Sequence, residues 1–267
     1  MGVEQTYYNA FTRAREYMKT SDKASRNTRS ETQRKDLELD ALSEILRSER
    51  FITCHSYQQG EINMLMHVGD SMGFRINTFT HILEGYKVAD KMKTHGVGAS
   101  TFSDWWAYKY EVIEAIPYNA AILDRMGVVT AINSDDAEMG RRLNQEAAKA
   151  VKYGGLSEEE ALKFVTLNPA KLLHLDHRMG SIAKGKDADI VLWSDHPLSV
   201  YSVAEFTFVD GSLYYSREVH NALRERDHAE RKRLVKKMME LKGNKTKSPS
   251  YIEPENKHCI NEEDLLQ

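Results

Sequence analysis

The sequence lacks several features that mark particular protein classes. Its 267 residues include only two cysteines, Cys54 and Cys259, which are too far apart in unlike contexts to suggest a disulfide framework. No apolar run approaches the ~20 residues that span a bilayer. Met1–Gln5 offers no basic start before an apolar stretch, so the sequence predicts no signal peptide. We expect no membrane partner and a cytoplasmic location by default, unless the natural N-terminus lies upstream.

Strong charge of one sign is also missing. The chain carries 37 Lys and Arg against 40 Asp and Glu, a formal net charge of −3. Residues 217–242 predict a charged helix in which acidic side chains are interleaved with the basic ones, as on a solvated helix face. The sequence contains no zinc-finger, P-loop or dinucleotide motif. These observations predict no nucleic-acid partner.

The first half of the chain alternates short apolar runs with helical patterns. Apolar spacing predicts helices at 3–19 and 36–48, with a mobile polar loop at 20–35. A repeat then follows, with predicted strands at 51–55, 75–81, 97–103 and 128–134 and intervening helices at 61–72, 85–94 and 118–126. This order predicts a parallel sheet covered on both faces.

The second half of the chain does not continue the strand–helix alternation. It predicts helices at 139–153 and 157–167, a short helix from Asn168 through Leu173, two β-segments within 180–193, and a hairpin of 203–209 with 212–215. Ser157 with Glu160 forms a capping-box pattern, and Asp210-Gly211 is a favoured hairpin turn. The residues from about Gly243 onward are polar and predict a disordered tail.

Polar side chains end three of the predicted strands. His55 and His81 stand 26 residues apart, about one strand–helix repeat, and Asp135 follows the last strand. Two imidazoles and a carboxylate at one edge of a parallel sheet are the donors of a divalent metal site. The alternatives are buried histidines satisfied by the backbone, and an Asp135 that caps the following helix, a role that Asp136 fits as well.

Other polar or aromatic residues follow the same strand ends. Candidate substrate contacts are Tyr57, Gln58, Glu84 and Trp105, beside Gln59, Asp104 and Trp106. The polar residues could equally belong to a solvated loop, and the tryptophans could equally fill the space at the end of the sheet without contacting substrate. His67 and His95 lie on predicted helices, where we expect them at the surface.

Several stretches together resemble the amidohydrolase superfamily, in its imidazolonepropionase-like branch. They are Cys54-His55-Ser56, residues 80–90, Asn133-Ser134-Asp135, and Thr166–Lys171 with the Gly-Ser-Ile and Lys-Gly-Lys-Asp-Ala-Asp segments at 180–191. The resemblance implies a TIM-type barrel with a β-sandwich and hydrolysis of C–N bonds by one or two divalent metals. It also implies that His55, His81 and Asp135 bind metal and that Asp135 takes the proton from the attacking water.

One departure from the family pattern is informative. The family begins its metal site with a His-x-His pair, and this sequence contains none. The chain therefore resembles only the C-terminal half, barrel strands five to eight with part of the sandwich. We predict an α/β fold: a partial barrel at 1–178, a sandwich segment at 179–216, a charged helix at 217–242 and a tail at 243–267.

Four strands alone would leave two open parallel edges. We therefore expect a partner chain or a second copy to complete the barrel, or the sequence to be an incomplete product of a longer one. The expected activity is metal-dependent hydrolysis of an amide, cyclic amide, imidazolone or dipeptide-like small molecule. Zinc is the favoured metal, with iron and manganese as alternatives. The other hypothesis is a non-catalytic binding or structural module.

Overall fold

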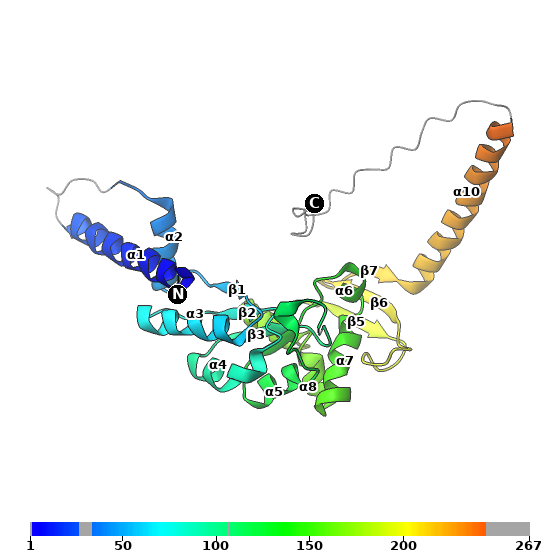
Figure 1. The fold of residues 1–267 in the computed structure, drawn as a ribbon. Helices are drawn as coiled ribbons and strands as arrows, with labels where there is room; N and C mark the ends of the chain where they lie inside the picture. The colour runs from blue at the N-terminus through cyan, green and yellow to red at the C-terminus, as the bar shows by residue number, and fades with distance from the viewer. Residues whose placement is uncertain (1, 27–33, 106, 244–267) are drawn as a thin grey trace. The chain divides into compact units, whose positions relative to one another are not determined.

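The computed structural model describes residues 2–26, 34–105 and 107–243 (Figure 1). Its contacts divide the chain into two units, of which the first ends at Tyr214 and the second begins at Tyr215. Each unit is described by itself. The predicted segment boundaries at 178, 216 and 242 are not tested by this division and stay predictions.

A four-stranded parallel sheet forms the centre of the first unit. Its strands are β1 (Thr53–His55), β2 (Thr78–Thr80), β3 (Gly98–Thr101) and β4 (Thr130–Ile132), in that spatial order. In register, His55 lies opposite Thr80 and Thr101 lies opposite Ile132. The predicted parallel sheet is confirmed, although each strand is shorter than its apolar run, because only part of each run pairs with a neighbour.

Helices connect these strands. They are α3 (Gln59–Met72), the 3₁₀ turn η1 (Gly85–Val88), α4 (Ala89–His95), the 3₁₀ turn η2 (Tyr110–Val112) and α5 (Asn119–Arg125). Gly73 and Gly96 end α3 and α4 in the left-handed conformation, which glycine adopts without a steric penalty. Each helix therefore stops where the sequence predicts, and the chain turns into the next strand.

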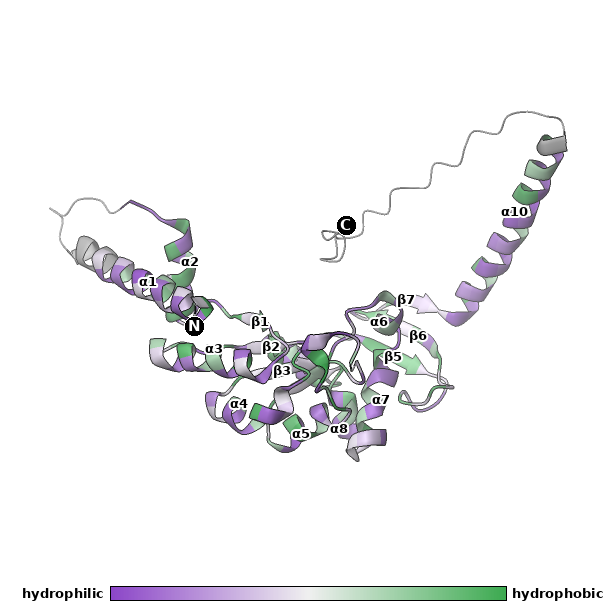
Figure 2. Cartoon of the chain, in the orientation of Figure 1, coloured by the Kyte–Doolittle hydropathy of each residue, from purple (hydrophilic) through white to green (hydrophobic). Residues whose placement is uncertain are grey.

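The main core lies under β1–β3. Ile62 and Met66 of α3, Phe79 of β2 and Met92 of α4 are almost fully buried there. A second cluster on the β4 side gathers Ile132, Leu156 and Phe164 with three alanines. In Figure 2 the helices beside the sheet carry both hydrophobic (green) and hydrophilic (purple) residues along their length.

The two outer strands of the sheet differ. The outer edge of β4 is covered, because Ile132 N donates to Phe164 O (3.0 Å) and Asn168 Nδ2 donates to Thr130 O (2.8 Å). Among the described residues no strand pairs with the outer edge of β1. The expectation of two open edges is therefore wrong for β4, since the chain after α8 folds back and satisfies that edge.

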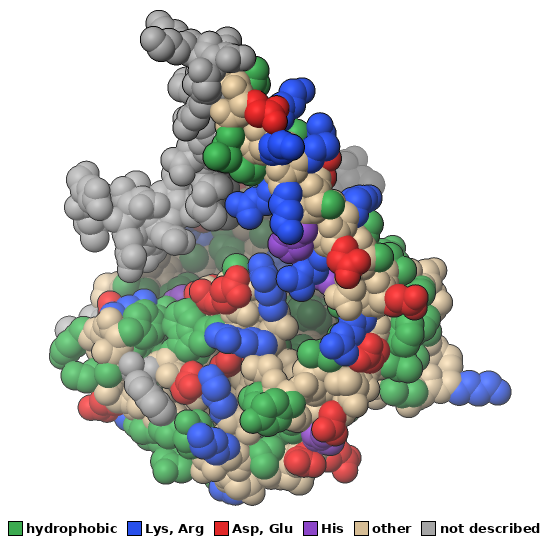
Figure 3. Space-filling view, turned by 90° about the vertical axis from the view of Figure 1, so that its right-hand side faces the viewer, with side chains coloured by type: hydrophobic (Ala, Val, Ile, Leu, Met, Phe, Trp, Pro, Cys, Tyr) green, Lys and Arg blue, Asp and Glu red, His purple; other side chains and the backbone are tan. Residues whose placement is uncertain are grey.

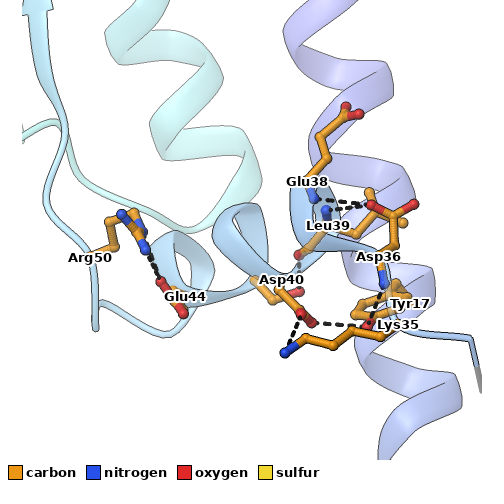
Figure 4. A network of polar contacts seen from close by, with 9 residues as sticks. Tyr17, Lys35, Asp36, Glu38, Leu39, Asp40, Glu44 and Arg50 are labelled. Carbon is orange, nitrogen blue, oxygen red and sulfur yellow. Dashed lines mark hydrogen bonds and ion pairs between the residues drawn. The ribbon is translucent and has the colours of Figure 1, made fainter.

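Two helices precede the sheet: α1 (Gly2–Arg26) and α2 (Leu37–Leu46). Figure 4 shows how they are joined. Tyr17 of α1 donates to Asp40 (2.9 Å), and Asp36 caps α2 by accepting from Glu38 N and Leu39 N. Helix α1 continues past the predicted start of the 20–35 loop, since that polar segment contains neither proline nor glycine. Residues 27–33 of the predicted loop lie outside the described residues.

Four short helices follow β4. They are α6 (Ala137–Gly140), α7 (Leu143–Gly154), α8 (Glu158–Lys163) and α9 (Leu167–Leu172). The predicted helix at 139–153 is thus two helices, with a break between Gly140 and Leu143. The capping box of α8 is confirmed, because Ser157 Oγ accepts from Glu160 N and the Glu160 carboxylate accepts from Ser157 N.

A three-stranded sheet follows, formed by β5 (Ile190–Trp193), β6 (Ala204–Val209) and β7 (Ser212–Ser216). Strands β5 and β6 are antiparallel, and Asp210 and Gly211 both have positive φ, as the predicted hairpin turn requires. The predicted β-segment before β5 is wrong. Its backbone is used in turns instead, with Lys186 N bonded to Ala183 O and Asp187 N to Arg178 O.

Helix α10 (Arg217–Gly243) makes up the described part of the second unit and confirms the predicted charged helix. On the face drawn in Figure 3, Lys and Arg side chains are interspersed with Asp and Glu. Within the described ranges, no helix combines the length and apolar character needed to cross a membrane. The predicted disordered tail lies outside the described residues from 244 onward.

Candidate active site

Two histidines meet at the carboxyl ends of β1 and β2. The Nδ1 atoms of His55 and His81 lie 2.5 Å apart, and the two rings are nearly perpendicular. His55 is exposed and His81 is half-buried. Parallel pairing places both residues at the same edge of the sheet, so side chains 26 residues apart in sequence point at one place.

Backbone strain marks this edge. His81 (φ 63°) and Asp135 (φ 51°) both occupy the left-handed region, which few residues other than glycine adopt. Each follows directly on a strand or its terminal loop. Strained residues of this kind cluster where a side chain has to be aimed at a ligand or a reacting group.

The protonation of His81 is biased by its surroundings. Burial of the ring and the neighbouring His55 lower its pKa, while the Asp135 carboxylate opposes them and Lys109 adds to the lowering. The net shift is downward, so His81 is neutral near pH 7. A neutral imidazole is the form that binds a metal ion.

Asp135 and Asp136 have separate roles. Asp136 is the N-cap of α6, since its Oδ1 accepts from Glu138 N (2.9 Å) and Met139 N (2.8 Å). Asp135 is exposed and close enough to His81 to act on its pKa. The capping alternative therefore applies to Asp136 and leaves the Asp135 carboxylate available at the site.

The described residues do not form a complete set of metal ligands. Among them, no group of three His, Cys, Asp or Glu side chains has an arrangement that could hold a metal ion. Catalytic zinc takes three protein ligands, with nitrogen at ~2.0–2.1 Å. Imidazole nitrogens such as those of His55 and His81 are the donor type that this ion takes, but the further donors do not come from the described residues as they are arranged.

Cys54 is not a third ligand in this arrangement. Burial, with a smaller contribution from Glu61, raises the pKa of its thiol. The thiolate that binds metals is therefore disfavoured. Cys54 and His55 instead border a cavity of about 430 Å³ between α1, β1 and α3.

An aromatic wall adjoins the histidines. Tyr57 meets His55 edge-on (4.8 Å between ring centroids), and Phe102 stacks on His81 (5.0 Å). Trp105 stacks in turn on Phe102 (4.6 Å) and donates its Nε1–H to Met139 Sδ. Tyr57 thus contacts the histidine pair directly and Trp105 adjoins it through Phe102, and contact of either residue with substrate stays a prediction. Trp106 lies outside the described residues.

Lys109 and Tyr108 were missed by the sequence reasoning. Lys109 Nζ donates to the Tyr57 hydroxyl (3.0 Å) and lies over the same ring. Burial and the neighbouring Tyr57 hydroxyl raise the pKa of Tyr108 to about 12. Their position in the loop after β3 is the signal that could have identified them, since such loops face the site in barrels.

Two other candidates are placed differently. Glu84 is buried, and its carboxylate accepts from Gln59 N (3.0 Å) and pairs with Lys87 (3.2 Å). Those contacts fasten the start of α3, so the solvated-loop reading is wrong for this residue. Gln58 is the N-cap residue of α3 and makes no capping bond with its side chain. A role for either residue in substrate binding stays a prediction.

Comparisons with known proteins agree with this architecture. The family model described as "Amidohydrolase family" matches residues 113–215. The amidohydrolase tasK of Hapsidospora irregularis is 27% identical over 231 residues, which are 82% of this chain and 23% of that protein. An imidazolonepropionase of Thermoplasma volcanium is 28% identical over 165 residues, which are 59% of this chain and 40% of that protein.

A solved structure gives a close match in fold. The crystal structure of an amidohydrolase from Thermotoga maritima MSB8 superposes with a TM-score of 0.73 and 29% identity, covering 81% of this chain and 56% of that one. The chain thus spans only part of the length of these relatives. Its β1–β4 sheet and helices form a partial TIM-type barrel. The family model, the matched relatives and this fold together support membership of the amidohydrolase superfamily.

Proposed function

We propose that this chain contributes to the active site of a metal-dependent hydrolase that acts on C–N bonds. The observation that carries the proposal is the convergence of His55 and His81 at the carboxyl edge of the sheet, with Asp135 acting on the same ring. The family match supports the hydrolase class. The substrate class is an amide, cyclic amide, imidazolone or dipeptide-like molecule.

The side chains take distinct parts in this proposal. His55 and His81 would hold the ion through ring nitrogens, and a bound divalent metal would lower the pKa of water toward 7 and polarise a carbonyl. Asp135 is an exposed carboxylate beside His81 and accepts a proton. Tyr57 and Lys109, joined to each other, offer hydrogen-bond donors to a substrate oxygen. Zinc suits these donors, as do iron and manganese.

The missing donors have to come from outside the described residues. The open outer edge of β1 carries His55, so a segment that pairs there would approach the metal-binding nitrogens. We propose that a partner chain or a second copy of this chain supplies it. One added segment would then both pair with the open edge of β1 and supply the missing metal donors.

The test is metal content. After loading the full chain with zinc and removing free ions, we expect His55→Ala and His81→Ala to lose most of the bound metal, measured by mass spectrometry. His67→Ala is the matched control, since His67 is exposed on α3 and outside the site. Equal metal in all three variants would refute the assignment of the two histidines.

A second candidate is a non-catalytic module, favoured by the absence of a three-ligand group among the described residues. It predicts no stoichiometric metal in any preparation, including one supplied with zinc during expression. Robust turnover of a C–N substrate by the isolated zinc-loaded chain would contradict it. The same turnover would show that no partner is needed.

A further inference from the structure

We propose that a cavity at the opposite edge of the sheet binds a phosphate group. The cavity, of about 250 Å³, lies where β2, β3 and β4 begin and where α9 ends. The candidate active site lies at the carboxyl ends of the strands, so this is a separate place. The proposal does not depend on the hydrolase function.

The lining is basic. Arg75, Lys93 and Lys171 contribute three positive charges, and among the described residues no Asp or Glu lines the cavity. Arg75 and Lys171 are exposed and form no ion pair within the described part of the chain. By contrast, the cavity beside His55 contains Glu4 and Glu61. Three uncompensated cations in one hollow are notable in a chain whose net charge is −3.

The residues that line the cavity are fixed by hydrogen bonds and packing contacts with one another. Lys93 Nζ donates to Gly127 O (2.9 Å), and Asn77 Nδ2 donates to Leu172 O (2.8 Å). Leu172 lies so close to Gly98 that a Cβ there would meet its Cδ2 at 2.1 Å. The end of α9 is thus fixed against the start of β3, and a ligand would find the site formed beforehand.

Phosphate fits this arrangement in charge and size. An arginine guanidinium binds phosphate oxygens through two parallel hydrogen bonds, and lysine ammonium groups add point charges. The volume is below the ~300–1,000 Å³ of pockets for drug-sized ligands. The hollow therefore accommodates free phosphate or the phosphoryl end of a longer ligand, with the remainder of that ligand in solvent.

The experiment is calorimetric titration of the full chain with inorganic phosphate at low ionic strength. We expect saturable binding that weakens with added salt. Arg75→Gln and Lys171→Gln should each weaken it about tenfold, as when one charge-assisted hydrogen bond is lost. Lys184→Gln is the matched control, because Lys184 is exposed and lies outside the cavity. Circular dichroism would verify the fold of each variant.

A second arm identifies the source of the phosphate group. Tighter binding of glycerol phosphate than of inorganic phosphate would assign the cavity to a phosphorylated ligand, and the reverse order to the free ion. His81→Ala should leave either affinity unchanged, which separates this site from the metal site. Absence of binding by both ligands, or equal affinities in wild type, R75Q and K171Q, would overturn the proposal.

Discussion

Strands β1 and β4 are the two outer strands of the parallel sheet, but β4 is covered by other segments and β1 is exposed. Thr130, Ala131 and Ile132 of β4 are all buried, whereas Thr53 and His55 of β1 are exposed. The difference arises from the chain that follows each strand. Phe164 and Asn168 return to satisfy the backbone of β4, whereas among the described residues no strand pairs with the outer edge of β1.

This contrast bears on function as well as on stability. His55, one of the two converging ring nitrogens, belongs to the uncovered strand. An uncovered parallel edge exposes unpaired backbone groups and favours the addition of another strand. In the proposed function, a strand added beside β1 would pair the open edge and supply the missing donors together.

The largest expected difference is between two threonines, Thr130 and Thr53, which begin the outer strands β4 and β1. Thr130→Lys buries a charge at a fully enclosed position and should cost about 3–5 kcal/mol of unfolding free energy. Thr53→Lys, on the open edge, should change that free energy by less than about 0.5 kcal/mol. Urea unfolding measures both. A large loss in the Thr53 variant would mean that the β1 edge is covered in solution.

An intermediate effect is expected for two asparagines. Asn168→Ala leaves the buried carbonyl of Thr130 without its donor, which should cost about 1–3 kcal/mol. Asn63 on α3 makes only a surface bond to Lys91, and Asn63→Ala should cost less than about 0.5 kcal/mol. The measurement is the shift of the urea unfolding midpoint of each variant, with the m-value unchanged. Similar losses for both variants would argue against the covering of the β4 edge.

The smallest expected effect is the loss of a helix cap, and it should be the same on the β1 side and the β4 side. Ser157 caps α8 near β4, and Asp36 caps α2, which precedes β1. Either residue changed to alanine should cost about 1 kcal/mol, because a cap satisfies the local helix end on whichever side it lies. Thermal melting of the two variants gives the comparison. A loss on one side only would show that the helix on the other side is not coupled to the fold.

Helix ends and tight turns could be predicted from the sequence. Gly73 and Gly96 stop their helices as predicted, and Ser157 with Glu160 forms the predicted capping box. The hairpin at Asp210 is confirmed for the same reason. Each of these depends on residues close together along the chain, so no distant contact is needed to specify them.

Contacts between distant segments could not be read in this way. The helical pattern around His95 predicts a surface position, yet its side chain is only 2% exposed and bonds both Asp70 and Ile76 N. The sequence around Glu84 is also compatible with a solvated loop, whereas its carboxylate fastens the start of α3. In both cases the partner lies about 20 residues or more away, and the pattern of one helix or loop does not contain it.

The sequence alone determined the alternation of strands and helices, the parallel sheet and the placement of His55, His81 and Asp135 at strand ends, because hydrophobic periodicity and turn residues act locally. Only the tertiary structure decided that one sheet edge is covered and the other open, that Asp136 caps α6 while Asp135 acts on His81, and that three cations line one cavity where β2, β3 and β4 begin. Those outcomes depend on how segments far apart in the chain pack together.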